Sequence, residues 1–230
     1  MSTVLFISET LIIVAALILA AFLSEKYIIG KRGGRIPVMT PKKIAMTGVF
    51  AAVSGVLMLI EVPLPFAPPF YKLDISEVPV LILSFAYGPV SGILCELIKI
   101  FVKLLVKGTS SAFVGELANF VIGASLILPA GLLYAGKKTK KRALTSLLAG
   151  TAVMTVFGSL FNAFYLLPKF AEIYGMPLSA IIGMGTAIHP AIDSVSMLVL
   201  FCVVPMNLLK GIVDTVITRL LYKRLSPVIK

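Results

Sequence analysis

Four polar side chains interrupt two apolar stretches in the C-terminal half of the chain. Asn162 and Tyr165 lie in FNAFYLLP, and Asn207 and Lys210 lie in VPMNLLKG. Residues three apart share one face of a helix, so Asn207 and Lys210 project together. Amides donate and accept hydrogen bonds and lysine adds donors, which suits a flat, neutral ligand rich in hydrogen-bonding groups. A structural alternative is an ion pair between Lys210 and Asp214, four residues further on.

The stretch 61–76, EVPLPFAPPFYKLDIS, is unusual in composition because it holds four prolines and three aromatic residues. Proline stiffens the backbone, and aromatic rings supply apolar contact area. Either this stretch is a lid over an external pocket, or its aromatic residues form a belt at a membrane interface.

Two further clusters of charged and polar residues have helical spacing. Glu116 and Asn119 are three apart and share a face, where they either cap a helix or join a ligand site. Lysines recur every four residues from Lys99 to Lys107, and Glu96 comes three before the first of them. Ion pairing with Glu96 and snorkelling are favoured over a stripe that attracts substrate.

The composition shows which solvent these elements require. Of the 230 residues 59% are hydrophobic and 13% are charged, against about 45–50% and about 25% in soluble domains. A mean hydropathy of +1.05 excludes a soluble enzyme, a disordered tail and a coiled coil. Apolar stretches predict seven membrane spans, the last kinked at Pro205, and an interfacial or re-entrant helix at 178–190. The spans are expected at 4–23, 44–62, 77–88, 89–107, 116–135, 144–167 and 197–222.

The positive charges predict the orientation. Fifteen of the 21 basic residues fall in 24–43, in 136–143 and in the tail from 219. Cytoplasmic loops are the ones enriched in Lys and Arg. Seven spans then place the N-terminus outside, if 4–23 spans, and the C-terminus in the cytoplasm. The net charge of +11 is therefore a signal of topology and a contact with lipid headgroups rather than a nucleic-acid patch.

Catalytic and metal-binding patterns are missing from the sequence. It has no phosphate-binding GxxxxGK[ST], no HExxH and no GxSxG. His189 is the only histidine, which excludes a multi-histidine metal site. We therefore predict no enzyme, no catalytic residue and no metal.

Small residues at a spacing of four mark the stretch 44–62. Gly48 and Ala52 form one such pair, and Ala51 and Gly55 form another. Small residues let two helix backbones approach closely. The pairs serve packing within this chain or docking of another membrane protein.

Taken together, these segments resemble a known family. YKLDISEVPVLILSFAYGPVSGILCELIK, GTSSAFVGELANFVIGASLILPAGLLY, FNAFYLLPKF, MGTAIHPAI and VPMNLLKG are similar to the riboflavin-binding S component, the substrate-specificity subunit of energy-coupling factor (ECF) transporters. The resemblance runs from about residue 44 to 228. It implies an all-α, six-helix membrane bundle, here with one extra N-terminal transmembrane helix.

The resemblance also implies roles for particular residues. Asn162, Asn207 and Lys210 would contact the flavin, and the loop from Phe70 to Asp74 would close the pocket. The small-residue face would meet the partner scaffold. The predicted docking residues are Gly48, Ala51, Ala52 and Gly55. The predicted substrate-binding residues are Phe70, Tyr71, Leu73, Asp74, Glu116, Asn119, Asn162, Tyr165, Asn207 and Lys210.

The predicted organisation is an anchor with a basic cytoplasmic loop at 1–43 and a six-helix substrate-binding domain at 44–230, in the cell membrane. The resemblance implies riboflavin as transported substrate, no cofactor of its own, and a coupling module made of a transmembrane subunit and two ABC-type ATPases that use ATP. Three alternatives stay open: an S component for a different vitamin, a scaffold without ligand, and a stand-alone transporter coupled to protons or sodium through Glu96, Glu116 and Asp214.

Overall fold

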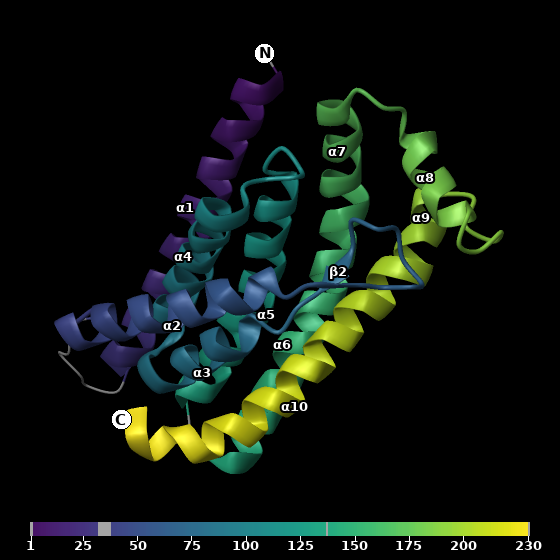
Figure 1. The fold of residues 1–230 in the computed structure, drawn as a ribbon. Helices are drawn as coiled ribbons and strands as arrows, with labels where there is room; N and C mark the ends of the chain where they lie inside the picture. Colours follow the sequence, from purple (N-terminus) through teal and green to yellow (C-terminus); the bar gives the residue numbers. More distant parts are fainter. Residues whose placement is uncertain (1, 32–37, 137, 230) are drawn as a thin grey trace.

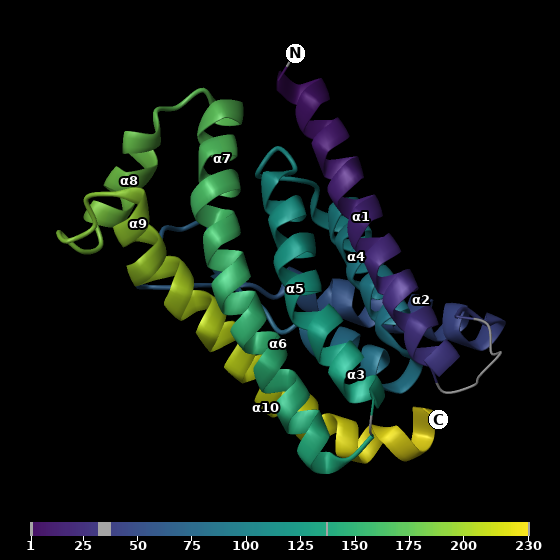
Figure 2. The same ribbon diagram turned by 180° about the vertical axis from the view of Figure 1, so that it is seen from behind.

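A computed structural model gives the fold of residues 2–31, 38–136 and 138–229, which are the described residues. Four basic residues that entered the predicted orientation lie outside them: Arg32, Arg35, Lys137 and Lys230. The described chain is predominantly helical, as predicted, and its arrangement in space is shown from two opposite sides in Figure 1 and Figure 2.

The elements follow one another with short connections. α1 (Ser2–Lys31) precedes α2 (Pro41–Leu59), and a hairpin of β1 (Val62–Pro63) and β2 (Lys72–Leu73) leads to α3 (Glu77–Tyr87). The remaining elements are α4 (Pro89–Lys107), α5 (Val114–Gly136), α6 (Lys140–Phe161), η1 (Asn162–Leu166), α7 (Leu167–Tyr174), α8 (Leu178–Thr186), α9 (Val195–Leu198), η2 (Val199–Val203) and α10 (Val204–Ile229). Figure 1 shows α4 and α5 beside α1, with α2 lying across them and α10 crossing the bundle obliquely.

Capping residues determine where several helices begin. The Thr40 hydroxyl accepts a hydrogen bond from the Lys43 backbone N–H at 3.3 Å, at the start of α2. Thr139 does the same for Arg142 at 3.2 Å, at the start of α6. These bonds satisfy donors that the first turn of a helix leaves free. Gly88 makes the sharp break between α3 and α4. Its φ is +107°, a backbone conformation that residues with a side chain rarely adopt.

The membrane spans differ in part from the sequence prediction. Within the described ranges, five helical stretches are long and apolar enough to cross a bilayer: 5–31, 41–59, 114–136, 140–174 and 195–225. The predicted spans at 77–88 and 89–107 do not qualify. α3 has only 11 residues, and α4 carries a glutamate and three lysines. Most of α3 is buried inside the protein, and so are Glu96, Lys99 and Lys103 of α4, which keeps their charges out of the lipid.

Two prolines continue their helices instead of ending them. Pro168 lies just after the π-helical turn η1, and Pro205 lies just after the π-helical turn η2. Proline removes a backbone donor and its ring presses on the preceding turn, and a wider turn relieves this clash. The kink predicted at Pro205 is therefore a π-turn that precedes it. The helix predicted to end at 167 continues to Tyr174 for the same reason.

Candidate functional site

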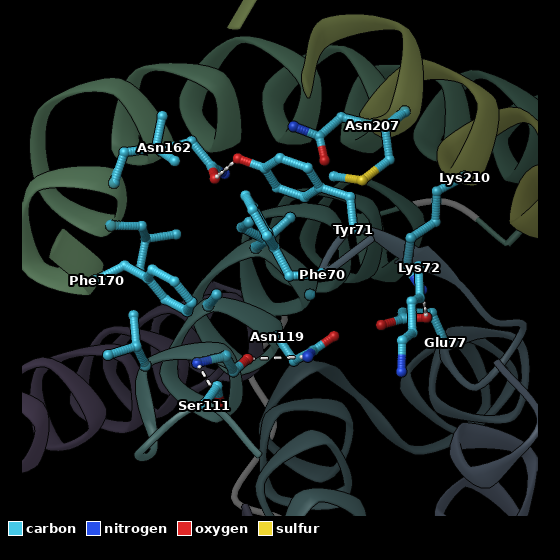
Figure 3. Close-up of a pocket in the computed structure, with 18 residues that line it drawn as sticks. Phe70, Tyr71, Lys72, Glu77, Ser111, Asn119, Asn162, Phe170, Asn207 and Lys210 are labelled. Carbon is cyan, nitrogen blue, oxygen red and sulfur yellow. Dashed lines mark hydrogen bonds and ion pairs between the residues drawn. The ribbon is translucent and has the colours of Figure 1, made fainter. Parts of the chain in front are cut away.

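A cavity lies between α5, the η1–α7 segment, α10 and the loop that carries β2. It encloses about 840 Å³ of space between atoms, part of it open to solvent. Six of the ten predicted substrate-binding residues line it: Phe70, Tyr71, Asn119, Asn162, Asn207 and Lys210. Figure 3 shows Phe70 and Tyr71 projecting into it from the loop. The structure therefore brings these six residues together from four separate elements.

Two buried asparagines, Asn162 and Asn207, form what we call the amide wall of the cavity. Asn162 donates to the Gly158 carbonyl at 2.9 Å and accepts from the Tyr71 hydroxyl at 3.0 Å. Burial raises the pKa of the Tyr71 phenol, which keeps it protonated and able to donate. Asn162 is thus satisfied by the protein itself.

Asn207 differs because its acceptor is unused. Its amide nitrogen lies 3.5 Å from the Ser159 hydroxyl, and its side-chain oxygen has no hydrogen-bond partner within the described residues. The residue is only 1% exposed. Buried polar groups are normally hydrogen-bonded, and leaving one unpaired costs free energy. A cavity-lining orphan acceptor is therefore a place where a ligand N–H or O–H fits.

Lys210 faces the cavity beside the amide wall, yet its donors are occupied. Its ammonium lies 2.6 Å from a Glu77 carboxylate oxygen, 3.3 Å from an Asp74 carboxylate oxygen and 3.2 Å from the Asp74 carbonyl. Three partners match the three donors of an ammonium group. The structural alternative from the sequence, a Lys210–Asp214 pair, is wrong. Both Asp214 carboxylate oxygens have no hydrogen-bond partner among the described residues.

Behind Lys210, the ionic contacts continue into the core. Lys99 is fully buried and lies 2.8 Å from Glu77 and 2.9 Å from Glu96, and it donates to the Ser76 hydroxyl at 2.9 Å. Its predicted pairing with Glu96 is confirmed. We call Asp74, Glu77, Glu96, Lys99 and Lys210 the charged cluster. Charges removed from water need partners of this kind, and this cluster supplies them from α3, α4, α10 and the loop before α3.

The stretch 61–76 folds over the cavity. Val62 pairs with Leu73 and Pro63 with Lys72 in the short hairpin of β1 and β2. The Phe70 ring packs on Tyr71 with centroids 4.5 Å apart, and stacks on Phe170 of α7 at 5.4 Å. These contacts place aromatic surface over the opening, which supports the lid interpretation of this stretch over a belt at the interface.

An ionic contact attaches the hairpin to α4. The Glu61 carboxylate accepts from Lys72 at 2.6 Å and also from Lys107 at the end of α4. The two lysine hydrogen bonds outweigh partial burial and lower the pKa of Glu61. One carboxylate thus holds the lid strand to the bundle.

Four predicted binding residues lie outside the cavity lining: Leu73, Asp74, Glu116 and Tyr165. Leu73 pairs with Val62 in the hairpin, and the Asp74 carboxylate forms an ion pair with Lys210. Tyr165 points elsewhere, because its hydroxyl donates to Glu9 of α1 at 2.7 Å.

Glu116 serves the start of α5. It accepts from Lys103 at 2.5 Å, from Ser111 at 2.8 Å and from Thr109 at 3.0 Å. The contact with Lys103 joins α5 to α4, and all three donors are side chains rather than backbone N–H groups of the first turn of α5. Asn119 lines the cavity, with its amide donating to the Gly115 carbonyl at 2.9 Å.

The small residues of α2 divide between two faces. Ala51 and Gly55 are buried within the chain. A Cβ at Gly55 would lie 2.7 Å from Val102 Cβ of α4, so this pair permits close packing of α2 on α4. These two residues are not available to a partner, which corrects the sequence prediction. Gly48 and Ala52 face outward and remain exposed.

Several lining residues were not predicted. The sequence shows Glu77 as an acidic residue at the start of an apolar stretch. Its contact with Lys210 could not be predicted, because the two residues are more than a hundred positions apart in the chain. Apolar lining residues carry no signal that separates them from core. The unpredicted lining residues are Lys72, Glu77, Ser111, Val114, Gly115, Ala118, Ile122, Gly123, Leu166, Leu167, Phe170 and Met206.

A multi-pass helical bundle with a lidded, amide-lined cavity defines a membrane protein that binds a small ligand between its helices. Comparison with known proteins specifies the class further. The family model for the ECF transporter, substrate-specific component, matches residues 42–222. The chain belongs to this family. Because the family and the relatives are transporters, the prediction of a transporter subunit rather than an enzyme is confirmed, and the stand-alone transporter alternative is not supported.

Individual relatives are similar over most of the chain. The riboflavin transporter FmnP of Bacillus subtilis (strain 168) is 33% identical over 82% of this chain and 94% of its own length. The riboflavin transporter RibU of Staphylococcus aureus (strain TCH60) is 34% identical over 82% and 93%. A solved structure described as "Structure and mechanism of the S component of a bacterial ECF transporter" matches with a TM-score of 0.64 and 36% identity, over 82% of this chain and 98% of that one.

Proposed function

We propose that this chain is the riboflavin-binding subunit of an ATP-driven vitamin importer. The family is that of substrate-specific components, and the relatives from B. subtilis and S. aureus are named as riboflavin transporters. The observation that carries the proposal is the unpartnered, buried Asn207 oxygen in a lidded cavity. The names of the relatives favour riboflavin over another vitamin.

The chemistry of riboflavin matches the cavity. Its isoalloxazine ring has a uracil-like edge on which acceptors alternate with an N–H donor, and that donor suits the free Asn207 oxygen. Phe70, Tyr71 and Phe170 offer aromatic surface to the ring faces. Lys210 adds positive charge at the same depth, and it must exchange one carboxylate contact to bind the ligand directly.

A flavin titration tests this proposal. We expect the freshly extracted protein to show a flavin absorbance spectrum, and the ligand-free protein to bind added riboflavin. Asn207→Ala should weaken binding by about 1–3 kcal/mol, because a ligand donor is left unpaired. Thr155→Val is the matched control, since Thr155 lies outside the cavity lining and its hydroxyl bonds its own helix at the Thr151 carbonyl. Equal riboflavin affinity in the wild type and Asn207→Ala would show that Asn207 is not part of the binding site. If the protein bound a different vitamin and not riboflavin, the proposed ligand would be wrong.

The family describes one component of a transporter, and we propose that the rest is a coupling module of a transmembrane subunit and two ABC-type ATPases. Gly48 and Ala52, which face outward on α2, are the proposed docking residues. A Cβ at Gly48 would have no atom within 4 Å, so Gly48→Leu should fold normally. We expect this variant to bind riboflavin and to lose uptake in cells that contain the module, whereas the exposed control Val53→Leu keeps both.

For the orientation, we propose an external N-terminus and a cytoplasmic C-terminus. The end of α1, the facing ends of α5 and α6 and the end of α10 lie at one end of the molecule, opposite the N-terminus and the α7–α8 connection (Figure 1). The described parts of the three basic clusters belong to these helix ends. Labelling of whole cells with an impermeant maleimide tests this. Ser179→Cys should react and Lys140→Cys should not, and native Cys95 and Cys202 are buried.

A further inference from the structure

The helix α1 lies outside the residues that the family model matches, yet it is built into the bundle. The model covers 42–222, and α1 ends at Lys31. The relatives and the solved structure are covered almost completely while leaving about a fifth of this chain unmatched. Phe6 and Ala21 of α1 are nevertheless 2% and 0% exposed and belong to the main hydrophobic core. α1 therefore packs against the bundle along one face, while most of its surface stays exposed.

One carboxylate of α1 reaches the segment that forms a wall of the cavity. Glu9 accepts a hydrogen bond from the Tyr165 hydroxyl at 2.7 Å and lies 3.4 Å from the Lys169 ammonium. Tyr165 belongs to η1 and Lys169 to α7. The residues between and beside them, Leu166, Leu167 and Phe170, line the cavity. Glu9 therefore contacts this wall at two positions, one before and one after the cavity-lining residues Leu166 and Leu167.

The wall has a local weakness at this point. η1 is a π-helical turn that Pro168 follows, so its backbone lacks a regular α-helical ladder. Figure 2 shows α1 and α7 on opposite sides of the upper part of α5. The contact of Glu9 with Tyr165 and Lys169 therefore spans this part of the bundle. Stacking of Phe161 on Tyr165, with centroids 5.1 Å apart, orients the phenol toward Glu9.

A simple membrane anchor would have no use for a glutamate at this position. A carboxylate in a membrane helix is costly unless it is paired, and Glu9 lies between Ser8 and Thr10, in the one polar break of an otherwise apolar stretch of α1. We propose that Glu9 is a positioning residue for ligand binding: through Tyr165 and Lys169 it holds the η1–α7 wall against the cavity and slows escape of the ligand. This inference rests on the proposed function only for the identity of the ligand, riboflavin.

Dissociation kinetics with riboflavin test the inference in the full-length protein. We expect Glu9→Leu and Tyr165→Phe each to speed release of bound riboflavin about 3–10-fold, with a smaller change in association. The double variant should release no faster than the faster single variant, because both changes break the same bond. Glu9→Gln should recover part of the slow release, since its amide oxygen still accepts from Tyr165. Thr10→Val is the matched control, because the Thr10 hydroxyl bonds only its own helix at Phe6 in the described contacts.

A second readout separates this inference from the proposed function. Amide hydrogen exchange of 162–174 in the ligand-free protein should be faster in Glu9→Leu than in the wild type and Thr10→Val. If the wild type binds riboflavin while Glu9→Leu leaves both release and exchange unchanged, the inference is wrong and the proposed function stands. Additive effects in the double variant would also overturn it. If the wild type binds no riboflavin but exchange accelerates in Glu9→Leu, the positioning role stands and the proposed ligand is wrong.

Discussion

The amide wall and the charged cluster meet at Lys210, but they use their polar groups in opposite ways. In the charged cluster, the ammonium groups of Lys99 and Lys210 each have three partner atoms within the protein. In the amide wall, the Asn207 oxygen has none among the described residues. A lysine whose donors all have partners within the protein stabilises the fold, whereas an unsatisfied acceptor that lines a cavity can stabilise a complex. The Glu96 oxygens also accept no hydrogen bond among the described residues, but Glu96 does not line the cavity. Burial of a polar group alone therefore does not identify a binding residue.

The largest expected effect comes from breaking the charged cluster at its centre. Lys99→Met leaves Glu96 buried without its cation and removes one of the two cations from Glu77. Removing one partner of a buried ion pair typically costs about 3–5 kcal/mol, so we expect a loss of that size in the free energy of unfolding, measured by SDS titration in detergent micelles. The double variant Lys99→Met/Glu96→Met should recover most of it, because Glu77 keeps Lys210. A single variant as stable as the wild type would contradict a structural role for the cluster.

The next prediction compares the two regions directly. Asn207→Leu should lower riboflavin affinity by about 1–3 kcal/mol and leave the stability of the ligand-free protein unchanged or higher, because it removes an unpaired acceptor. Lys210→Met should lower both, since Asp74 and Glu77 lose a shared cation. Parallel titration and unfolding measurements on both variants check this. If Asn207→Leu destabilised the protein as much as Lys210→Met, the distinction between the two regions would fail.

A smaller effect is expected where the lid meets the amide wall. Tyr71→Phe removes the hydroxyl that donates to Asn162 at 3.0 Å and keeps the aromatic ring on Phe70. We expect riboflavin affinity to fall by about 0.5–1.5 kcal/mol, the net value of a typical hydrogen bond. Tyr174→Phe is the control, because that hydroxyl donates to the Ser110 carbonyl away from the amides. Equal losses of riboflavin affinity in Tyr71→Phe and Tyr174→Phe would show that the hydrogen bond to Asn162 makes no specific contribution to binding.

Sequence alone singled out the two asparagines of the amide wall because asparagines in apolar helices are costly and therefore informative. Asn162, Asn207 and Lys210 all line the cavity, as expected. The charged cluster could be predicted only in part from the sequence. The Lys99–Glu96 pair is local, but the Lys210–Asp74 contact joins segments that are far apart in the chain. Both carboxylates that hold Lys210 come from residues more than 130 positions earlier in the chain, so the sequence pointed to the nearby Asp214, which was wrong.

The backbone around the site shows the same limit. Pro168 and Pro205 indicate an irregular helix, but local sequence does not distinguish a kink or a helix end from a π-turn. The tertiary packing of the helices on either side decides which occurs. α4 likewise has the length of a span, and its charges are tolerated only because Glu77 and Glu116 reach it from other elements.

The smallest predicted effect on stability concerns the contact of Glu61 with Lys72 and Lys107 at the surface. It tests how an exposed group of charges differs from the buried charged cluster. The folded protein lowers the pKa of Glu61 below its ordinary value of 4.5. The contribution of Glu61 to stability is therefore present above the pKa of the unfolded state and is lost as the pH falls through the lower folded value. Exposed ion pairs contribute about 0.2–1 kcal/mol and are screened by salt. We expect Glu61→Gln to lower the unfolding temperature slightly at pH 7 and not at all at a pH below the folded pKa, or in concentrated salt. A difference between variant and wild type that persists in acid would mean that Glu61 acts through packing, because no charge would remain to remove.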